Sequence, residues 1–161
     1  MAVRSRRVLC KPLNQTGIVF MQAPTDHSLL PHLVQLADSA PDVAALWLYG
    51  SRARGDHGAD SDYDLAVVFM DRIADRLERR LRPELLALEW QSALQLPENQ
   101  LSIVDLSACP IPLGWSILSD GKLLADKTPD VRMRAESRIY SMWEIDYLYQ
   151  QPSKAAVSCQ L

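Results

Sequence analysis

Apolar and polar residues alternate along the chain in blocks that predict helices and strands. From Asp26 the segment DHSLLPHLVQLADSA repeats apolar residues at helical spacing, and Pro41 ends it. Residues 43–50, VAALWLYG, form a nearly continuous apolar run, which is typical of a strand buried on both faces. Residues 63–70, YDLAVVFM, predict a second strand, and the short polar link between the two strands favours an antiparallel pair.

The second half of the chain continues this pattern. Residues 71–96 carry leucines at helical intervals, and we expect Pro83 to begin a second helical segment rather than lie inside one. Residues 100–106 predict a third strand, followed by a short helix, a turn at Gly121 and a short extended stretch. A long helix is predicted from residue 131. The fold class is therefore α/β (α+β), with a small mixed β-sheet flanked by helices.

Length and composition indicate one domain. The chain has 161 residues and a mass of 18.1 kDa, and 48% of its residues are hydrophobic while 23% are charged. Residues 1–24 show no useful periodicity and are interpreted as a flexible arm or an N-terminal extension. Residues 25–150 form the predicted domain, and residues 151–161 are interpreted as a flexible tail.

Charge and cysteine content limit the function classes. A net charge of −3 and a pI of about 5.6 argue against nucleic-acid binding through bulk positive charge. The arginines between residues 72 and 82 alternate with acidic residues and are interpreted as a salt-bridged outer helix face, with nucleic-acid contact as the alternative. Three widely spaced cysteines without a CxxC favour a reducing cytoplasm, and no apolar run is long enough for a membrane span.

The strongest chemical signal lies between the first two strands. Gly50 and Ser51 are followed, after ten residues, by Asp62-Tyr63-Asp64. Alternation along a strand directs Asp62 and Asp64 to the same face about 7 Å apart. Two carboxylates at this spacing repel unless a cation lies between them, and hard oxygen ligands suit Mg²⁺ together with a nucleotide phosphate. The spacing therefore predicts a metal platform beside a glycine-serine bend.

A third carboxylate, Asp105, interrupts an apolar strand. If that strand lies alongside the second one, Asp105 can join Asp62 and Asp64, and three carboxylates can hold two metal ions. Asp105 would then also be the natural general base. The alternative is that Asp105 only caps the turn that follows its strand.

The residues between the glycine and the carboxylates favour phosphate binding. Gly50 lets the backbone approach a phosphate, and Ser51 adds a hydroxyl and an amide donor. Arg52 or Arg54 can neutralise a triphosphate by charge-assisted hydrogen bonds, although solvated loop charges are an equal alternative.

The motif GSRARG followed by SDYDL resembles the nucleotidyltransferase superfamily. The short chain further resembles the minimal nucleotidyltransferases, the MntA antitoxins paired with HEPN toxins. The resemblance implies a polymerase-beta-like fold, with Gly50, Ser51 and Arg54 binding the nucleotide. It assigns catalysis and two Mg²⁺ ions to the three carboxylates, Asp62, Asp64 and Asp105. Tyr63 stands where such motifs more often carry an aliphatic residue.

The resemblance also implies an activity and a partner. An antitoxin of a type VII-like HEPN/MNT module would move AMP from ATP onto a tyrosine hydroxyl of its cognate HEPN ribonuclease, in a hetero-oligomer with that toxin. No direct nucleic-acid partner and no membrane partner are expected. Two alternatives stay open: a transferase acting on a small molecule such as an aminoglycoside, and an antitoxin that inhibits by occlusion without catalysis. Three tyrosines of the last helix, Tyr140, Tyr147 and Tyr149, are candidates for a partner surface.

Overall fold

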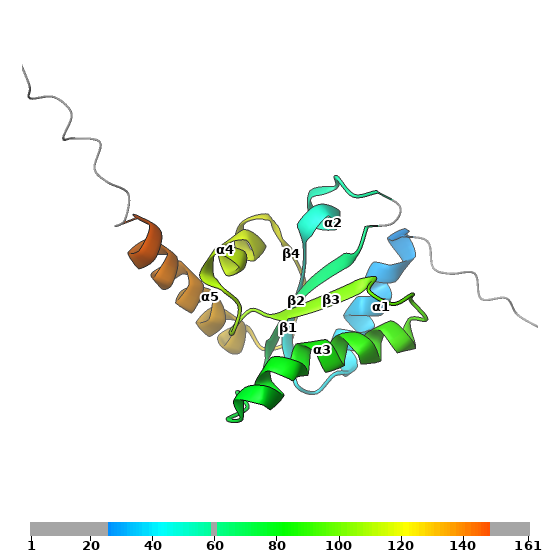
Figure 1. The fold of residues 1–161 in the computed structure, drawn as a ribbon, viewed down its shortest axis with the longest axis horizontal. Coiled ribbons are helices and arrows are strands. Elements are labelled where there is room, and N and C mark those ends of the chain that lie inside the picture. The colour runs from blue at the N-terminus through cyan, green and yellow to red at the C-terminus, as the bar shows by residue number, and fades with distance from the viewer. Residues whose placement is uncertain (1–25, 59–60, 149–161) are drawn as a thin grey trace, which may run out of the picture.

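The computed structural model describes residues 26–58 and 61–148. Within them the helices and strands follow the order predicted from the hydrophobic pattern (Figure 1). The helices are α1 (Asp26–Ser39), α2 (Gly50–Arg54), α3 (Arg76–Ala93), α4 (Ile111–Asp120), α5 (Pro129–Trp143) and the π-helix η1 (Glu144–Leu148). The strands are β1 (Val43–Tyr49), β2 (Tyr63–Phe69), β3 (Leu101–Asp105) and β4 (Lys122–Asp126). The expected arm at 1–24 and tail at 151–161 lie outside the described residues.

The four strands form one mixed sheet with the order β3-β2-β1-β4. Strand β1 pairs antiparallel with both β2 and β4, whereas β2 and β3 are parallel. The link between β1 and β2 is short and includes the helix α2, so the two strands can lie side by side in opposite directions. The predicted mixed sheet flanked by helices and the predicted antiparallel pair are confirmed.

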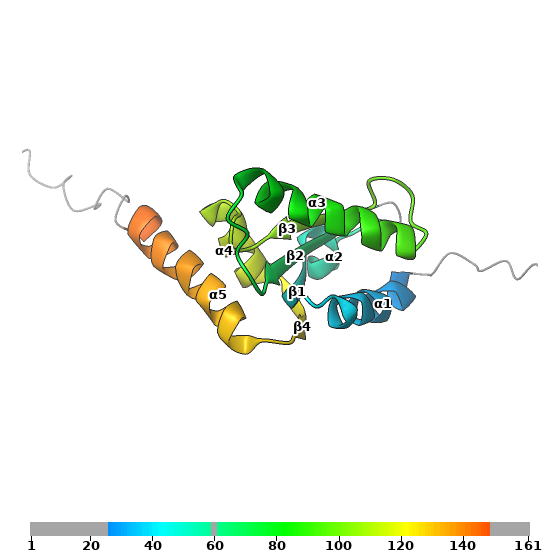
Figure 2. The ribbon, with the colours of Figure 1, turned by 90° about the horizontal axis from the view of Figure 1, so that it is seen from below.

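Helices cover both faces of the sheet (Figures 1 and 2). Helices α1 and α3 pack on the face that carries the odd-numbered residues of β2, from Tyr63 to Phe69. Helices α4 and α5 pack on the other face, which carries Ala66 and Val68. Strand β1 is buried along its length, in agreement with its unbroken apolar sequence. Alternation along β2 and β3 therefore decides on which side of the sheet each polar residue lies.

Helix α3 departs from the sequence prediction at Pro83. The helix runs through this residue without a break, and Pro83 is buried. Proline removes one backbone hydrogen bond, but the same helix buries Leu86, Ala87 and Trp90 against the sheet, and this packing offsets the loss. Asp75 caps the N-terminus by accepting hydrogen bonds from the amides of Leu77 and Glu78.

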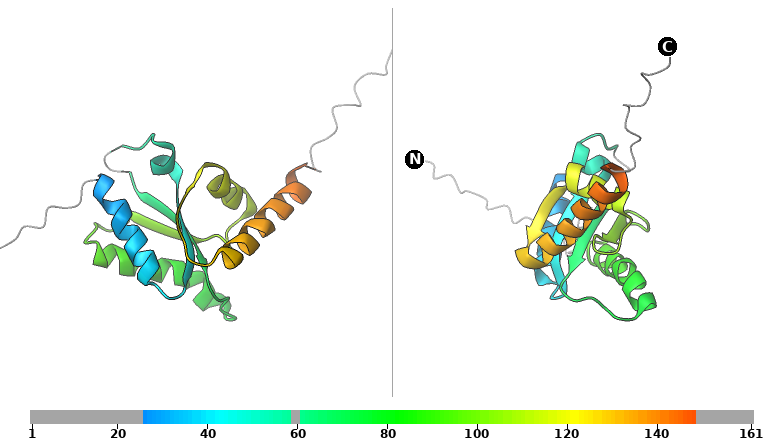
Figure 3. Two further views of the ribbon diagram at one scale, coloured as in Figure 1. Left: turned by 180° about the vertical axis from the view of Figure 1, so that it is seen from behind. Right: turned by 90° about the vertical axis from the view of Figure 1, so that its left-hand side faces the viewer.

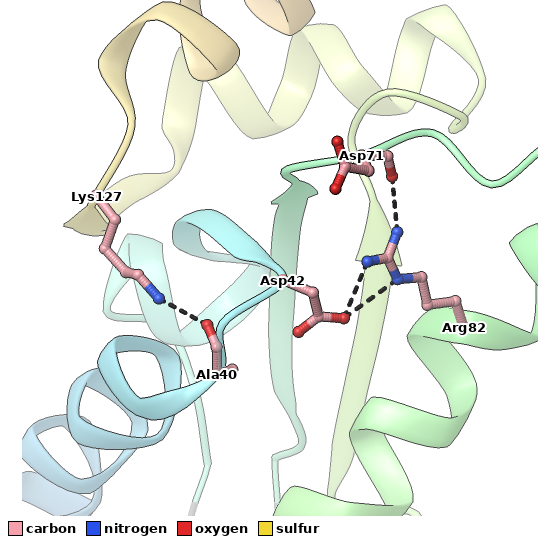
Figure 4. A network of polar contacts seen from close by, with 5 residues as sticks. All are labelled: Ala40, Asp42, Asp71, Arg82 and Lys127. Carbon is pink, nitrogen blue, oxygen red and sulfur yellow. Dashed lines mark hydrogen bonds and ion pairs between the residues drawn. The ribbon is translucent and has the colours of Figure 1, made fainter.

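Polar contacts join α3 and the C-terminal end of α1 to the segments that flank the strands (Figure 4). The Arg82 guanidinium donates from Nε and Nη2 to one carboxylate oxygen of Asp42, at 3.2 and 3.0 Å, and from Nη1 to the Asp71 carbonyl at 2.8 Å. It also lies 3.9 Å from the centre of the Phe69 ring. Lys127 donates to the Ala40 carbonyl at 2.6 Å and so satisfies the C-terminus of α1.

None of the helices in the described part of the chain has the length and apolar character that a membrane crossing requires.

Candidate functional site

The predicted glycine-serine bend is built as expected at the end of β1. Gly50 has φ +73°, a conformation that residues with a side chain rarely adopt. A Cβ placed on Gly50 would lie 2.3 Å from a carboxylate oxygen of Asp64. Position 50 therefore requires glycine for two reasons, its backbone conformation and the carboxylate that lies directly against it. Ser51 follows in the first turn of α2, and its carbonyl accepts hydrogen bonds from the amides of Gly55 and Asp56.

Asp62 and Asp64 come together at this bend. Asp64 is the second residue of β2 and is half-buried, whereas Asp62 precedes the strand and is exposed. Burial raises the pKa of Asp64, and the neighbouring charge of Asp62 raises this pKa further, while Arg54 acts in the opposite direction. A divalent cation between two neighbouring carboxylates would relieve the repulsion that raises the pKa of Asp64.

The two arginines of α2 differ in their surroundings. Arg52 binds backbone: its Nε donates to the carbonyls of Ser61 at 2.9 Å and Asp62 at 3.1 Å. Its guanidinium also lies 3.9 Å from the centre of the Tyr63 ring. Arg52 therefore positions the segment that carries Asp62. Arg54 is exposed, and its Nε lies 3.3 Å from an Asp56 carboxylate oxygen, a solvent-accessible pair that a nucleotide phosphate can replace.

Asp105 does not join the other two carboxylates, so the expectation of a three-carboxylate centre is wrong. The parallel ladder pairs Asp64 with Ser102, and it pairs Asp105 with Val67. Asp105 thus lies three residues, or about 10 Å, further along the strands, and alternation places it on the opposite face of the sheet from Asp64. Within residues 26–58 and 61–148, no group of three acidic, histidine or cysteine side chains is arranged to hold a metal ion.

The contacts of Asp105 are with the turn that follows β3. Its Oδ1 accepts a hydrogen bond from the Ser107 amide at 2.8 Å, and its carbonyl accepts from the amides of Ala108 and Cys109. This is the turn-capping alternative that the sequence left open. Burial raises the pKa of Asp105, while the hydrogen bonds of Ser107 and the charges of Arg82 and Arg138 lower it.

Two residues of the site were not singled out from the sequence. Ser102 is exposed and is the register partner of Asp64, so it occupies the place where we expected a third carboxylate. Tyr49 ends β1 opposite Asp64, and burial together with the Asp64 charge raises its pKa to about 12. Neither residue carries a signal of its own, because only the pairing register shows that it lies beside Asp64.

The donor set fits one Mg²⁺ ion better than two. Asp62 and Asp64 supply hard oxygen ligands, and Mg²⁺ in nucleotide sites is commonly held by one or two carboxylates together with substrate phosphates. A pair of ions bridged by three carboxylates does not fit, because the third member lies on the other face of the sheet.

The family comparison matches most of the folded part of the chain. Residues 32–130 match the family model described as polymerase beta, nucleotidyltransferase. This range contains Gly50, Ser51, Asp62 and Asp64 together with all four strands. No curated protein matches the sequence.

Solved structures share the fold. A chain of a toxin-antitoxin crystal structure with AMP-PNP is 25% identical, with a TM-score of 0.58 over 76% of this chain and 92% of that chain. A chain of the MntA-HepT toxin-antitoxin is 23% identical, with a TM-score of 0.54 over 76% and 90%. A chain from the Shewanella oneidensis complex of a tri-AMPylated HEPN toxin with its MNT antitoxin is 24% identical, with a TM-score of 0.53 over 76% and 89%.

Proposed function

Because the chain belongs to the polymerase beta nucleotidyltransferase family, we propose that it transfers AMP from ATP to a tyrosine hydroxyl of a cognate HEPN toxin and thereby acts as an antitoxin. The structural relatives support this assignment: one is a toxin-antitoxin with AMP-PNP, and another contains a tri-AMPylated HEPN toxin. In this proposal the chain and the toxin form a hetero-oligomer, and the reaction takes place in the cytoplasm.

The observation that carries the proposal is the contact between Gly50 and Asp64. A residue other than glycine would displace the Asp64 carboxylate, since its Cβ would lie 2.3 Å from that group. The Gly50 bend and a pair of carboxylates thus lie at the same point, and Arg54 lies beside them. The triphosphate of ATP brings the negative charge and oxygen atoms that this set of groups can use.

Each group of the site has a defined role in the proposed transfer. Gly50 and Ser51 hold the triphosphate, Arg54 neutralises part of its charge, and Arg52 keeps Asp62 in place through the backbone. Asp62 and Asp64 would hold Mg²⁺, which supplies charge neutralisation on the phosphates when bound. The acceptor oxygen forms a bond to the α-phosphorus, pyrophosphate leaves, and the hydroxyl proton passes to solvent.

The experiment is a transfer assay on the full chain. We incubate it with α-labelled ATP and Mg²⁺, with and without the protein encoded next to it, and follow the label by gel and by mass spectrometry. We expect label on a tyrosine of the neighbouring protein. Label on a small molecule, or ATP binding without any transfer, would contradict the proposal and support the aminoglycoside-type transferase or the occluding antitoxin respectively.

Matched variants connect the assay to the site. Asp64→Asn removes one carboxylate charge at the bend and is expected to lower transfer about 100-fold or more, since a metal ligand supports several kcal/mol of transition-state charge stabilisation. Asp130→Asn removes the same charge at an exposed position in the first turn of α5 and is expected to leave transfer unchanged. An equal loss in both variants would show that the assay reports overall charge rather than the site.

A further inference from the structure

A cavity lies at the other end of the sheet from α2. It has a volume of about 690 Å³ and is lined by the end of β2, the segment leading into α3, α3 itself and α5. In Figures 1 and 3 this end of the sheet lies at the bottom, whereas α2 lies at the top. The cavity is therefore separate from the site at Gly50.

Positive charge dominates the cavity lining. Five arginines and two aspartates contribute to it, so the formal excess is three positive charges in a chain whose net charge is −3. The arginines are Arg72, Arg79, Arg82, Arg134 and Arg138, and the aspartates are Asp71 and Asp105. The sequence pattern predicts a salt-bridged outer face for the arginines between residues 72 and 82. In the structure, Arg79 and Arg82 line this cavity.

Two of the arginines are held in place by the fold. Arg82 is bound by Asp42 and the Asp71 carbonyl, and Arg79 donates to the Ile73 carbonyl at 3.1 Å. The Asp42 carboxylate offsets the charge of Arg82, whereas the bond of Arg79 to a carbonyl offsets none of its charge. The two side chains therefore form a fixed wall of the cavity, on which Arg79 carries the positive charge.

The remaining three arginines are available to a ligand. Arg134 and Arg138 lie one turn apart on α5, Arg72 lies on the segment before α3, and all three are exposed. In the described residues no hydrogen bond or ion pair joins any of them to another side chain. Asp105 accepts a hydrogen bond from the Ser107 amide and also interacts with the charges of Arg82 and Arg138, so it offsets part of the positive charge. The guanidinium fork matches the oxygens of a phosphate group.

We propose that this cavity is a second ligand site, which binds a small molecule with two adjacent phosphoryl groups. A volume of about 690 Å³ lies in the range of small-molecule sites and is large enough for a nucleoside diphosphate. Three exposed guanidinium groups beside the fixed side chains of Arg79 and Arg82 can contact several phosphate oxygens at once. The ligand is held by arginines alone, so its binding requires no divalent cation.

Calorimetry on the full chain tests this site with inorganic pyrophosphate and ADP as probes. EDTA is present, so that the carboxylate pair at Gly50 lacks a cation. The variant Arg134→Ala/Arg138→Ala removes two exposed cavity arginines, and the control Arg76→Ala/Arg80→Ala removes two exposed arginines of α3 that do not line the cavity. Thermal midpoints of both variants establish that they fold.

We expect both probes to bind, with at least a tenfold weaker affinity in the α5 variant and less than a twofold change in the control. Equal affinity for pyrophosphate and ADP indicates recognition of the phosphates, and tighter binding of ADP indicates that the nucleoside also contributes. Absence of binding, an equal loss in both variants, or much tighter binding of a single-stranded RNA oligonucleotide would overturn the proposal. Because the probes bind without Mg²⁺ and without transfer, failure here leaves the antitoxin proposal unaffected, and the converse also holds.

Discussion

Two aspartates, Asp64 and Asp105, lie near opposite ends of β2, and the charged groups around them differ in sign. At the beginning of the strand, Asp64 lies against Gly50 and its pKa is raised by burial and by Asp62. Near its other end, Asp105 of β3 accepts a backbone hydrogen bond and lies near Arg82 and Arg138. At the first end a neighbouring carboxylate disfavours the charged form of Asp64, whereas at the second end arginines favour the charged form of Asp105.

This comparison shows that the pairing register decides what an aspartate can do. Strands β2 and β3 are adjacent and parallel, which is the arrangement in which the sequence predicts that Asp105 joins Asp62 and Asp64. The ladder instead opposes Asp64 to Ser102, and a displacement of three residues moves Asp105 both along the sheet and to its other face. The same residue type therefore lies beside a second carboxylate at one end of the sheet and caps a turn at the other.

The largest expected effect comes from Gly50→Ala. The new Cβ would collide with the Asp64 carboxylate, and the alanine backbone would have to adopt φ +73°. We therefore expect transfer to fall about 100-fold or more. We also expect the free energy of unfolding to fall by about 1–2 kcal/mol. Transfer assays and chemical denaturation measure both. Gly58→Ala is the matched control, because a Cβ there has only the Ser61 hydroxyl nearby, at 3.9 Å. Normal transfer by Gly50→Ala would show that the bend plays no part in catalysis.

At the other end of the sheet, Arg82→Ala tests structure rather than catalysis. It removes the ion pair with Asp42, the bond to the Asp71 carbonyl and the contact with the Phe69 ring. We expect the free energy of unfolding to fall by about 2 kcal/mol, since charged hydrogen bonds that are partly buried contribute more than exposed pairs. Transfer per folded molecule should stay unchanged. Arg80→Ala, an exposed neighbour, should change stability by no more than about 0.5 kcal/mol, and a similar loss in both variants would contradict this role of Arg82.

A smaller effect is expected on the pKa of Asp64 when Asp62 is changed. Asp62→Asn removes the like charge, so the pKa of Asp64 should fall, but it should stay above 3.8 because burial is the larger cause. Carboxyl ¹³C NMR titration in EDTA measures this shift. An unchanged pKa would mean that the two carboxylates do not interact.

The raised pKa of Asp64 also predicts how the stability of the fold changes with pH. The native state holds the Asp64 proton more tightly than the unfolded state does, so this group favours folding below pH 3.8 and its contribution is lost as pH rises through the folded-state pKa. In EDTA, the wild type should therefore gain thermal stability relative to Asp64→Asn as pH is lowered from 7 to 4. A constant difference between the two midpoints across this range would contradict the shift.

Most of the fold could be predicted from the sequence because its elements have clear periodicities. The unbroken apolar run of β1, the apolar run of β2 and the helical spacing in α1 each indicated the correct element. The family model and the shared fold of the solved structures confirm the resemblance first indicated by GSRARG and SDYDL. Pro83 was misjudged because local propensity predicts a break, whereas burial of the α3 face keeps the helix continuous.

The site could be predicted only where it is local in sequence. Gly50, Asp62 and Asp64 lie within fifteen consecutive residues, so a bend followed by a strand is enough to bring them together. Asp105 belongs to a distant strand, and no sequence pattern specifies the register of β3 against β2. The cavity at the other end was missed for a similar reason, because its arginines come from α3 and α5, which are far apart along the chain.

The smallest expected effect belongs to Asp105→Asn, and it tests the central claim most directly. The amide oxygen of asparagine can still accept the hydrogen bond from the Ser107 amide, so the fold should be kept while the charge is lost. Measured beside Asp64→Asn in the same transfer assay, Asp105→Asn should retain activity within about twofold of the wild type, since it lies on the other face of the sheet from the carboxylate pair. A loss in Asp105→Asn as large as that in Asp64→Asn would contradict a catalytic centre made of Gly50, Asp62 and Asp64 alone.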